Sequence, residues 1–429
     1  MNYWLLGYIL GVFGSAIAYL TGFLLLAELP ILIVLVGLAI TFGRWAVHLN
    51  GHLDPKIAGP MRLIFMVTII FVIKHLGMGG SLSNVLFAKM VLYMAVLASG
   101  ILIGFHEAPE GRDFDLAILA PLFILPFVFF LIFAKDQIPL KTVTLFNRNV
   151  FAGYFILMSA ILLGLAGNKP LVGPLMHGLI VATGLVVIGT LGSLAAFLGV
   201  VCGTLALQSL SDFSRFRLAA IIVLFGAVPL VLIMVLGGFS LEGGVWDRIS
   251  FVYQTTLNIL SGYDGTLADL DMATAVRFAA SGELDMSAFF RVLHWVDIYT
   301  VLAEGGTGTL LLGGGTDWVH QRIDSFVFAL AAHNEFLRLL VEQGLVLGGV
   351  LAGGIVLLGL SLWRSPAFVP MFSTIVFFGS ENQLNNFLST SLIFLVLGLY
   401  FGRQRRVQGQ GASRRHDQDG PSPAASTTS

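Results

Sequence analysis

Long apolar runs separated by short polar breaks dominate the chain. About nine runs near the 20-residue length that a membrane-spanning helix needs precede residue 240, at roughly 4–26, 29–47, 61–78, 84–104, 115–134, 150–167, 171–189, 192–210 and 218–237. After a long polar interval, three more follow at about 344–363, 366–380 and 386–402. The pattern predicts an all-α polytopic membrane protein with about 12 transmembrane helices.

Composition agrees with this prediction and excludes two classes of protein. Of 429 residues, 57% are apolar and 11% are charged. Soluble domains carry about 25% charged residues, so the composition excludes a water-soluble protein. The formal net charge is −1, which gives no basic excess for binding nucleic acid. The single cysteine, Cys202, excludes an internal disulfide framework and a thiolate metal cluster.

The basic residues predict the orientation of the spans. With the N-terminus in the cytoplasm, thirteen Lys and Arg residues lie inside and five lie in short outer loops or at outer helix ends, as the positive-inside rule favours. The first apolar run has no basic n-region and is expected to be a retained span. We therefore expect four regions: 1–237 with nine spans, 238–343 as one large extracytoplasmic loop, 344–402 with three spans, and 403–429 as a disordered cytoplasmic tail.

The outer loop is where charge collects. It holds 18 of the 47 charged residues, thirteen acidic and five arginine. A first helical segment, at about 286–304, places five residues on one face at a period of 3.6: Arg291, His294, Trp295, Ile298 and Leu302. One interpretation is a helix lying on the membrane with an Arg–Trp cation–π pair; the other is a functional face.

A glycine-rich stretch and a second helical segment follow. The stretch, about 305–316, is expected to be a turn, and it lacks the Gly-Lys-Ser/Thr of a nucleotide site. The second segment begins at His333-Asn334 and leads into the span at 344. Its spacing puts Glu335–Arg338 and Arg338–Glu342 at pairing distance. An ionisable group such as His333 at a membrane boundary is a functional candidate.

These segments resemble the O-antigen ligase and O-antigen polymerase superfamily. His333-Asn334, nine residues and Gly344 look like its His-Asn-x9-Gly signature. The resemblance extends over about 145–400, and further similar elements are Arg291 with Trp295, Leu312-Gly313-Gly314-Gly315, Asn147-Arg148-Asn149, Ser214-Arg215 and Ser380-Glu381-Asn382. Arg148 stands where the family usually has proline, and Leu347 stands where it expects a small residue or tyrosine.

The resemblance implies a GT-C-like membrane glycosyltransferase. Such enzymes transfer a glycan from undecaprenyl diphosphate to an acceptor hydroxyl on the periplasmic side of the bacterial inner membrane, and no metal or other cofactor is expected. His333 is the expected general base, since histidine titrates near neutral pH. Arg291 is the expected partner of the leaving diphosphate, because its planar fork binds phosphate oxygens bidentately. The expected substrate-binding residues are Asn334, Arg215, Arg148, Asn149, Arg338 and Trp295.

Several alternatives stay open. The acceptor is most consistent with a second carrier-linked repeat unit, as in an O-antigen or exopolysaccharide polymerase; a ligase would instead load lipid A-core. A polysaccharide or lipid flippase or exporter is disfavoured because the middles of the spans are almost free of charge. The five outer basic residues either widen the site for the anionic carrier or are solvated loop charges: Lys74, Lys89, Lys135, Lys141 and Arg148.

Overall fold

The described part of the chain is helical. In the computed structural model it comprises residues 37, 54–106, 253, 295, 298–300, 302–319, 334–361, 371–372, 375–376, 378–379, 390–391, 393–395 and 397–406, and none of these lies in a β-strand. The contacts divide the chain into two compact units. The first includes 54–70, 91–106 and the helix from Ser391, and the second includes 71–90 and the described residues between 253 and Thr390.

Helix α3, Pro55–Gly77, begins earlier than the apolar run at 61–78 predicts. Asp54 caps it: its Oδ1 accepts a hydrogen bond of 2.9 Å from the backbone N–H of Lys56. Asp is a favoured N-cap, and Pro55 occupies the first helical position, where proline is preorganised. Hydropathy alone misses this start because the first turn of the helix is not strongly apolar.

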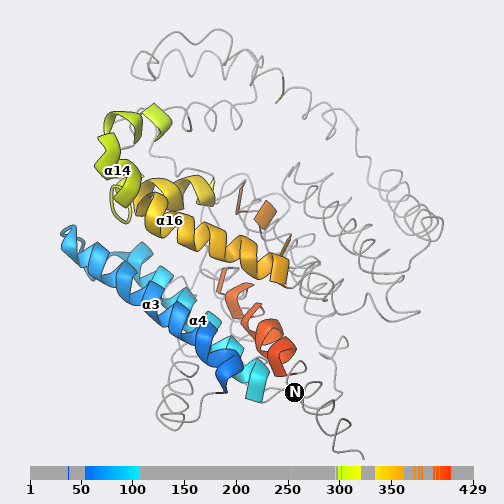
Figure 1. The fold of residues 1–429 in the computed structure, drawn as a ribbon. Coiled ribbons are helices and arrows are strands. Elements are labelled where there is room, and N and C mark those ends of the chain that lie inside the picture. The colour runs from blue at the N-terminus through cyan, green and yellow to red at the C-terminus, as the bar shows by residue number, and fades with distance from the viewer. Residues whose placement is uncertain are drawn as a thin grey trace, which may run out of the picture. The chain divides into compact units, whose positions relative to one another are not determined.

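A tight connection joins α3 to α4. Helix α4, Val85–His106, agrees with the predicted span at 84–104. Asn84 caps α4, with its Oδ1 accepting a 3.0 Å hydrogen bond from the N–H of Phe87. The ring of Phe87 stacks on His75 at 4.0 Å and on Phe71 at 5.4 Å between centroids. The two helices therefore form a hairpin with an ordered tip (Figure 1).

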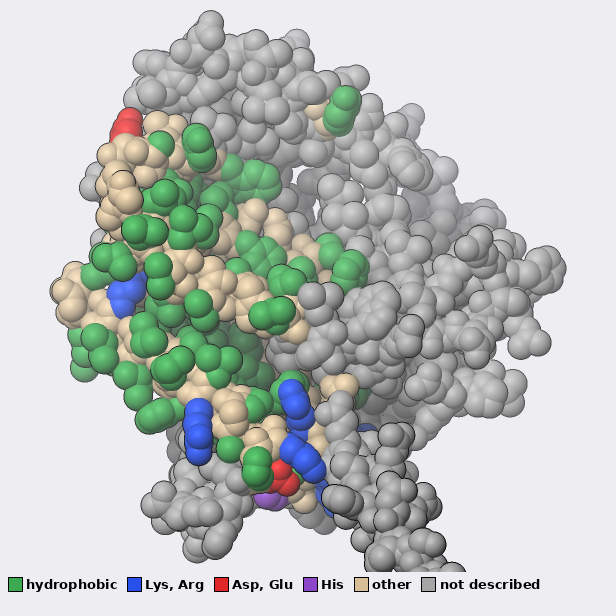
Figure 2. Space-filling view, viewed as in Figure 1, with side chains coloured by type: hydrophobic (Ala, Val, Ile, Leu, Met, Phe, Trp, Pro, Cys, Tyr) green, Lys and Arg blue, Asp and Glu red, His purple; other side chains and the backbone are tan. Residues whose placement is uncertain are grey.

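Three helices among the described residues are long and apolar enough to cross a membrane: α3, α4 and Glu335–Leu357 of α16. Of the apolar window of α3 only 17% of residues are buried, against 56% for α4. Figure 2 shows hydrophobic side chains across the exposed face, and on α3 these include Leu63, Phe65, Met66, Ile69, Ile70 and Ile73. Such an uncovered apolar surface is typical of a helix that faces lipid.

The helical residues 397–406 pack against α4 through two glycine pairs that the sequence reasoning missed. A Cβ on Gly100 would lie 2.7 Å from the carbonyl oxygen of Leu395, and one on Gly104 would collide with the carbonyl oxygen of Leu399. Reciprocally, Gly398 and Gly402 lie against the backbone of α4. This is a GxxxG element on each helix, and small residues at that spacing let two membrane helices approach closely.

The described helix extends into the first residues of the predicted tail, 403–429. The chain stays helical through Arg406. The guanidinium of Arg405 lies 5.0 Å from the centroid of the Phe401 ring, one turn earlier. Arginine is a good helix former, so this helix continues past the apolar run at 386–402; residues 407–429 lie outside the described part of the chain.

Two further helices build the region of interest. Helix α14, Gly306–Leu312, occupies most of the stretch that the sequence predicted as a glycine turn. It contains two threonines and three leucines, and Thr309 Oγ1 donates a 2.8 Å hydrogen bond to the carbonyl of Gly305. Helix α16, Glu335–Ser361, contains a break at Gly344. It therefore consists of a short helix, 335–343, and a long apolar helix from 345 that matches the predicted span at 344–363.

Candidate functional site

The short helix 335–343 has a defined start. Asn334 is its N-cap, with Oδ1 accepting a 3.0 Å hydrogen bond from the N–H of Leu337 and its carbonyl accepting one of 3.0 Å from the N–H of Arg338. Asn is among the best N-cap residues. The negative charge of Glu335, in the first turn, interacts favourably with the positive end of the helix dipole. The residue that follows His333 in the sequence is thus fixed at the start of the helix.

The charged face of this helix points into the protein. Glu335 is fully buried, and Arg338 and Glu342 are each 4% exposed. The guanidinium of Arg338 lies 3.2 Å from a carboxylate oxygen of Glu335 and 4.0 Å from one of Glu342. The predicted pairings at three and four residues are confirmed. Because buried charges are costly unless paired, these contacts restrain the orientation of the helix.

The helix ends where two glycines meet. Gly344 has φ 75° and ψ 173°, and Gly313, just after α14, has φ 75° and ψ 171°. A Cβ on Gly344 would collide with the carbonyl oxygen of Leu311, and a Cβ on Gly313 would collide with the carbonyl oxygen of Glu342. Only glycine readily adopts this backbone conformation. The glycine-rich loop and the helix break are therefore one interlocked feature.

The loop satisfies the last carbonyls of the helix. Gly314 N–H donates to the carbonyl of Val341 and Gly315 N–H to that of Glu342, each at 3.0 Å. The final carbonyls of a helix have no partner within the helix, so the loop acts as a cap supplied from elsewhere in the chain. Each of the three consecutive glycines has its own reason: a Cβ would collide with backbone at Gly313 and with the Trp318 side chain at Gly314, and Gly315 has a positive φ of 100°.

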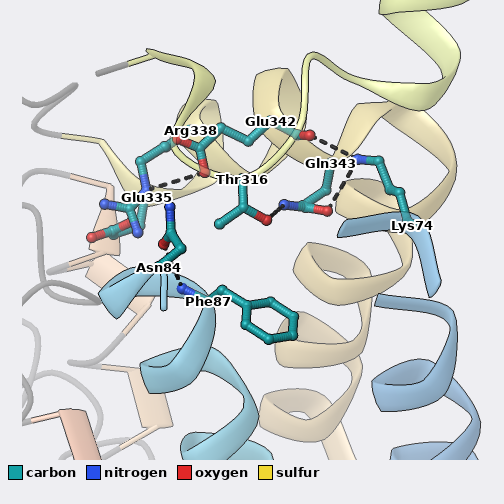
Figure 3. Close-up of polar contacts among 8 residues, drawn as sticks. All are labelled: Lys74, Asn84, Phe87, Thr316, Glu335, Arg338, Glu342 and Gln343. Carbon is teal, nitrogen blue, oxygen red and sulfur yellow. Dashed lines mark hydrogen bonds and ion pairs between the residues drawn. The ribbon is translucent and has the colours of Figure 1, made fainter. Parts of the chain in front are cut away.

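A lysine from α3 completes this cap. Lys74 Nζ donates to the carbonyl oxygen of Glu342 at 2.7 Å and to Gln343 Oε1 at 3.1 Å. Gln343 Nε2 in turn donates to Thr316 Oγ1 at 3.3 Å. Figure 3 shows these bonds in a line from α3 to the loop after α14. The sequence left Lys74 as either a cation of the carrier site or a solvated loop charge; the structure places its ammonium group in hydrogen bonds to protein, and a role in the carrier site stays a prediction.

The opposite face of the short helix is apolar. Val341 is fully buried in a cluster with Ile298 and Val319, and Leu302, Trp318 and Leu337 pack around it. The predicted helical face at 286–304 thus contributes Ile298 and Leu302 to a protein core. The described residues 295, 298–300 and 302–304 are helical, and Trp295 among them is half-buried.

The described site contains three of the predicted residues. Asn334 and Arg338 lie on one helix, and Trp295 lies in the segment whose Ile298 and Leu302 pack on that helix. The other five lie outside the described residues: His333, Arg291, Arg215, Arg148 and Asn149. Burial and ion pairing hold Arg338 in place, and its assignment to substrate binding stays a prediction.

The sequence reasoning missed Gln343 and Thr316, and it missed the partners of Lys74. Lys74 and Glu342 are 268 positions apart in the chain, and no periodicity or spacing connects positions so distant. A single lysine near the end of an apolar run is the one signal the sequence offers. Such a residue needs a polar partner or access to water, but the tertiary structure determines which partner it contacts.

The described residues offer no metal centre, since no group of three or more His, Cys, Asp or Glu side chains among them could hold an ion. The outer loop does contain an Asp-x-Asp pair, Asp269 and Asp271, which lies outside the described residues. The expected absence of a metal therefore rests on the family resemblance alone.

Comparison with known proteins adds no family assignment. No protein-family model matches the chain, and no curated protein matches it.

Proposed function

We propose that the chain is a membrane glycosyltransferase that uses a polyprenyl diphosphate-linked glycan as donor and an acceptor hydroxyl as nucleophile. One observation carries the proposal. The Gly313–Gly315 loop caps the helix between Asn334 and Gly344, so two sequence elements of the resemblance form a single structural unit. Unrelated matches to short motifs would have no reason to meet in this way.

The predicted topology supports the same proposal. It assigns the end of the third span and the start of the tenth span to the outer side of the membrane. The hydrogen bonds from Lys74 to Glu342 and Gln343 require these two ends to lie at the same side. Twelve spans, a large outer loop and a GT-C-like arrangement belong to this proposal, as does a bacterial inner membrane location with both termini in the cytoplasm.

The proposed reaction is a displacement at the anomeric carbon of the donor glycan. The acceptor hydroxyl loses its proton to His333 as its oxygen bonds to that carbon, and the bond from the carbon to the diphosphate oxygen breaks. The diphosphate leaves with the electron pair, and Arg291 stabilises its charge through a bidentate contact. By sequence Arg291 lies four residues before Trp295, one helical turn. Asn334 and Trp295, with Arg148, Asn149, Arg215 and Arg338, are the proposed binding residues.

The test is glycan transfer by His333→Ala and Arg291→Ala, compared with two controls at exposed residues of the same types, His106→Ala and Arg62→Ala. We expect a rate loss of about 100-fold or more for each site variant at equal amounts of inserted protein. Arg291→Lys should recover little activity, because a point charge does not reproduce the fork. Normal polymer length and yield from either alanine variant would contradict the assignment.

The same strains separate the two acceptors. If the enzyme is a polymerase, as the resemblance slightly favours, inactive variants retain acceptors capped with a single repeat unit. If it is a ligase for lipid A-core, they leave long chains on the lipid carrier. Lipid profiling distinguishes these patterns directly.

A further inference from the structure

The short helix 335–343 is hydrogen-bonded at its end to a lysine that is 268 positions away in the sequence. It has about two and a half turns, and a helix of this length is marginal without tertiary contacts. Its start bears the His333-Asn334 pair on which the proposed function rests. What fixes its far end therefore also fixes the position of its start.

The geometry of Lys74 suits this role. The negative end of a helix dipole attracts a cation, and Lys74 Nζ lies 2.7 Å from the carbonyl oxygen of Glu342, in the last turn. The second bond, to Gln343 Oε1 at 3.1 Å, ends on a side chain that is 3% exposed. Hydrogen bonds from a charged donor are roughly twice as strong as neutral ones. These two hydrogen bonds from Lys74, to Glu342 and to Gln343, are called the attachment below.

The attachment links three segments of the chain. Lys74 belongs to α3, and Gln343 continues the hydrogen bonding to Thr316, after the glycine loop. Beside them Gly315 faces Met78, whose Sδ would lie 3.6 Å from a Cβ at that glycine. The tip of the α3–α4 hairpin is therefore seated against the end of the short helix, and Lys74 supplies its polar contact.

We infer that Lys74 is a positioning residue of the proposed active site: through its bonds to Glu342 and Gln343 it sets the position of helix 335–343 and of the His333-Asn334 pair at its start. The inference deepens the proposed glycosyltransferase function and rests on it. Lys74 acts through the helix and is not assigned any contact with substrate.

The test has one readout that does not depend on activity. In a Cys202→Ser background, Val341→Cys places a single thiol at a position that is fully buried against Ile298 and Val319. Its rate of modification by N-ethylmaleimide reports how often the helix leaves its packed position. Lys74→Met keeps the apolar stem and removes the ammonium group, and Lys74→Arg keeps a charged donor. Lys56→Met, at an exposed lysine of the same helix, is the matched control.

We expect Lys74→Met to raise the modification rate about tenfold, the effect of losing a charged hydrogen bond, with Lys56→Met unchanged and Lys74→Arg close to the parent. In the transfer assay, Lys74→Met should lower kcat more than it changes KM, since the binding groups remain while the base is misplaced. Recovery of kcat by Lys74→Arg separates positioning from general loss of folded protein.

Each of the remaining outcomes would overturn one step of the inference. An unchanged modification rate in Lys74→Met overturns the attachment. A raised rate with unchanged kcat overturns the link to the active site. A raised rate in a chain whose parent transfers no glycan retains the attachment and overturns the proposed function. If Lys74→Met does not accumulate, Gln343→Met removes one of the two acceptors, and an unchanged rate in that variant overturns the attachment equally.

Discussion

Gly344→Ala is a direct test of the interlocked glycines. Gly344 has φ 75° and ψ 173°, a region that is nearly restricted to glycine. An added Cβ would also collide with the carbonyl oxygen of Leu311. The obstacle is backbone, so no side chain can rotate away to make room. The loop after α14 must move, or the helix must.

The expected cost follows from these contacts. Backbone strain at such a position amounts to about 1–3 kcal/mol. Moving the loop weakens the hydrogen bonds from Gly314 to Val341 and from Gly315 to Glu342, each with a net value of about 1 kcal/mol. Local opening of the helix should therefore become easier by about 3–5 kcal/mol, or about 100-fold or more in the opening equilibrium.

The thiol of Val341→Cys measures this opening, and Gly353→Ala is the matched control. Gly353 lies in the same α16, and a Cβ there would meet nothing within 4 Å, so alanine should change stability by about 1 kcal/mol or less. We expect maleimide modification to be about 100-fold faster in Gly344→Ala than in the control. Equal rates in the two variants would refute the reasoning that Gly344 is required for its backbone conformation and close contact.

Two further predictions concern other parts of the structure. Gly402→Val should separate the helix at 397–406 from α4 and lower the stability of the detergent-solubilised protein by about 1–3 kcal/mol, measured as the apparent Tm. Gly59→Val, at an open position on α3, should have a smaller effect, and similar losses in the two variants would argue against the glycine contact. Asn334→Ala should lose about 1 kcal/mol of helix stability, whereas Asn334→Asp should retain the cap. If Asn334 also binds substrate, Asn334→Asp will lose transfer activity while the thiol of Val341→Cys stays protected from modification. Full activity in Asn334→Asp would show that Asn334 serves only as the cap.

Local signals predicted much of the described structure. Apolar runs located α4 and the long half of α16, and the spacing of Glu335, Arg338 and Glu342 correctly predicted their ion pairs. These features depend on residues that are neighbours along a helix. The early start of α3 at Asp54 and Pro55 was also readable from capping rules, but a count of apolar residues does not include them.

The sequence by itself determined that this is a membrane protein, because a chain with 57% apolar and 11% charged residues cannot cover a water-exposed surface. It also selected the segments around Gly313 and Gly344, through their resemblance to family motifs. Only the tertiary structure decided that these two glycines touch, that the charged face of helix 335–343 is buried, and that Lys74 caps its end. Spacing along one helix fixes which residues share a face, but which face is covered, and by what, depends on segments hundreds of residues away.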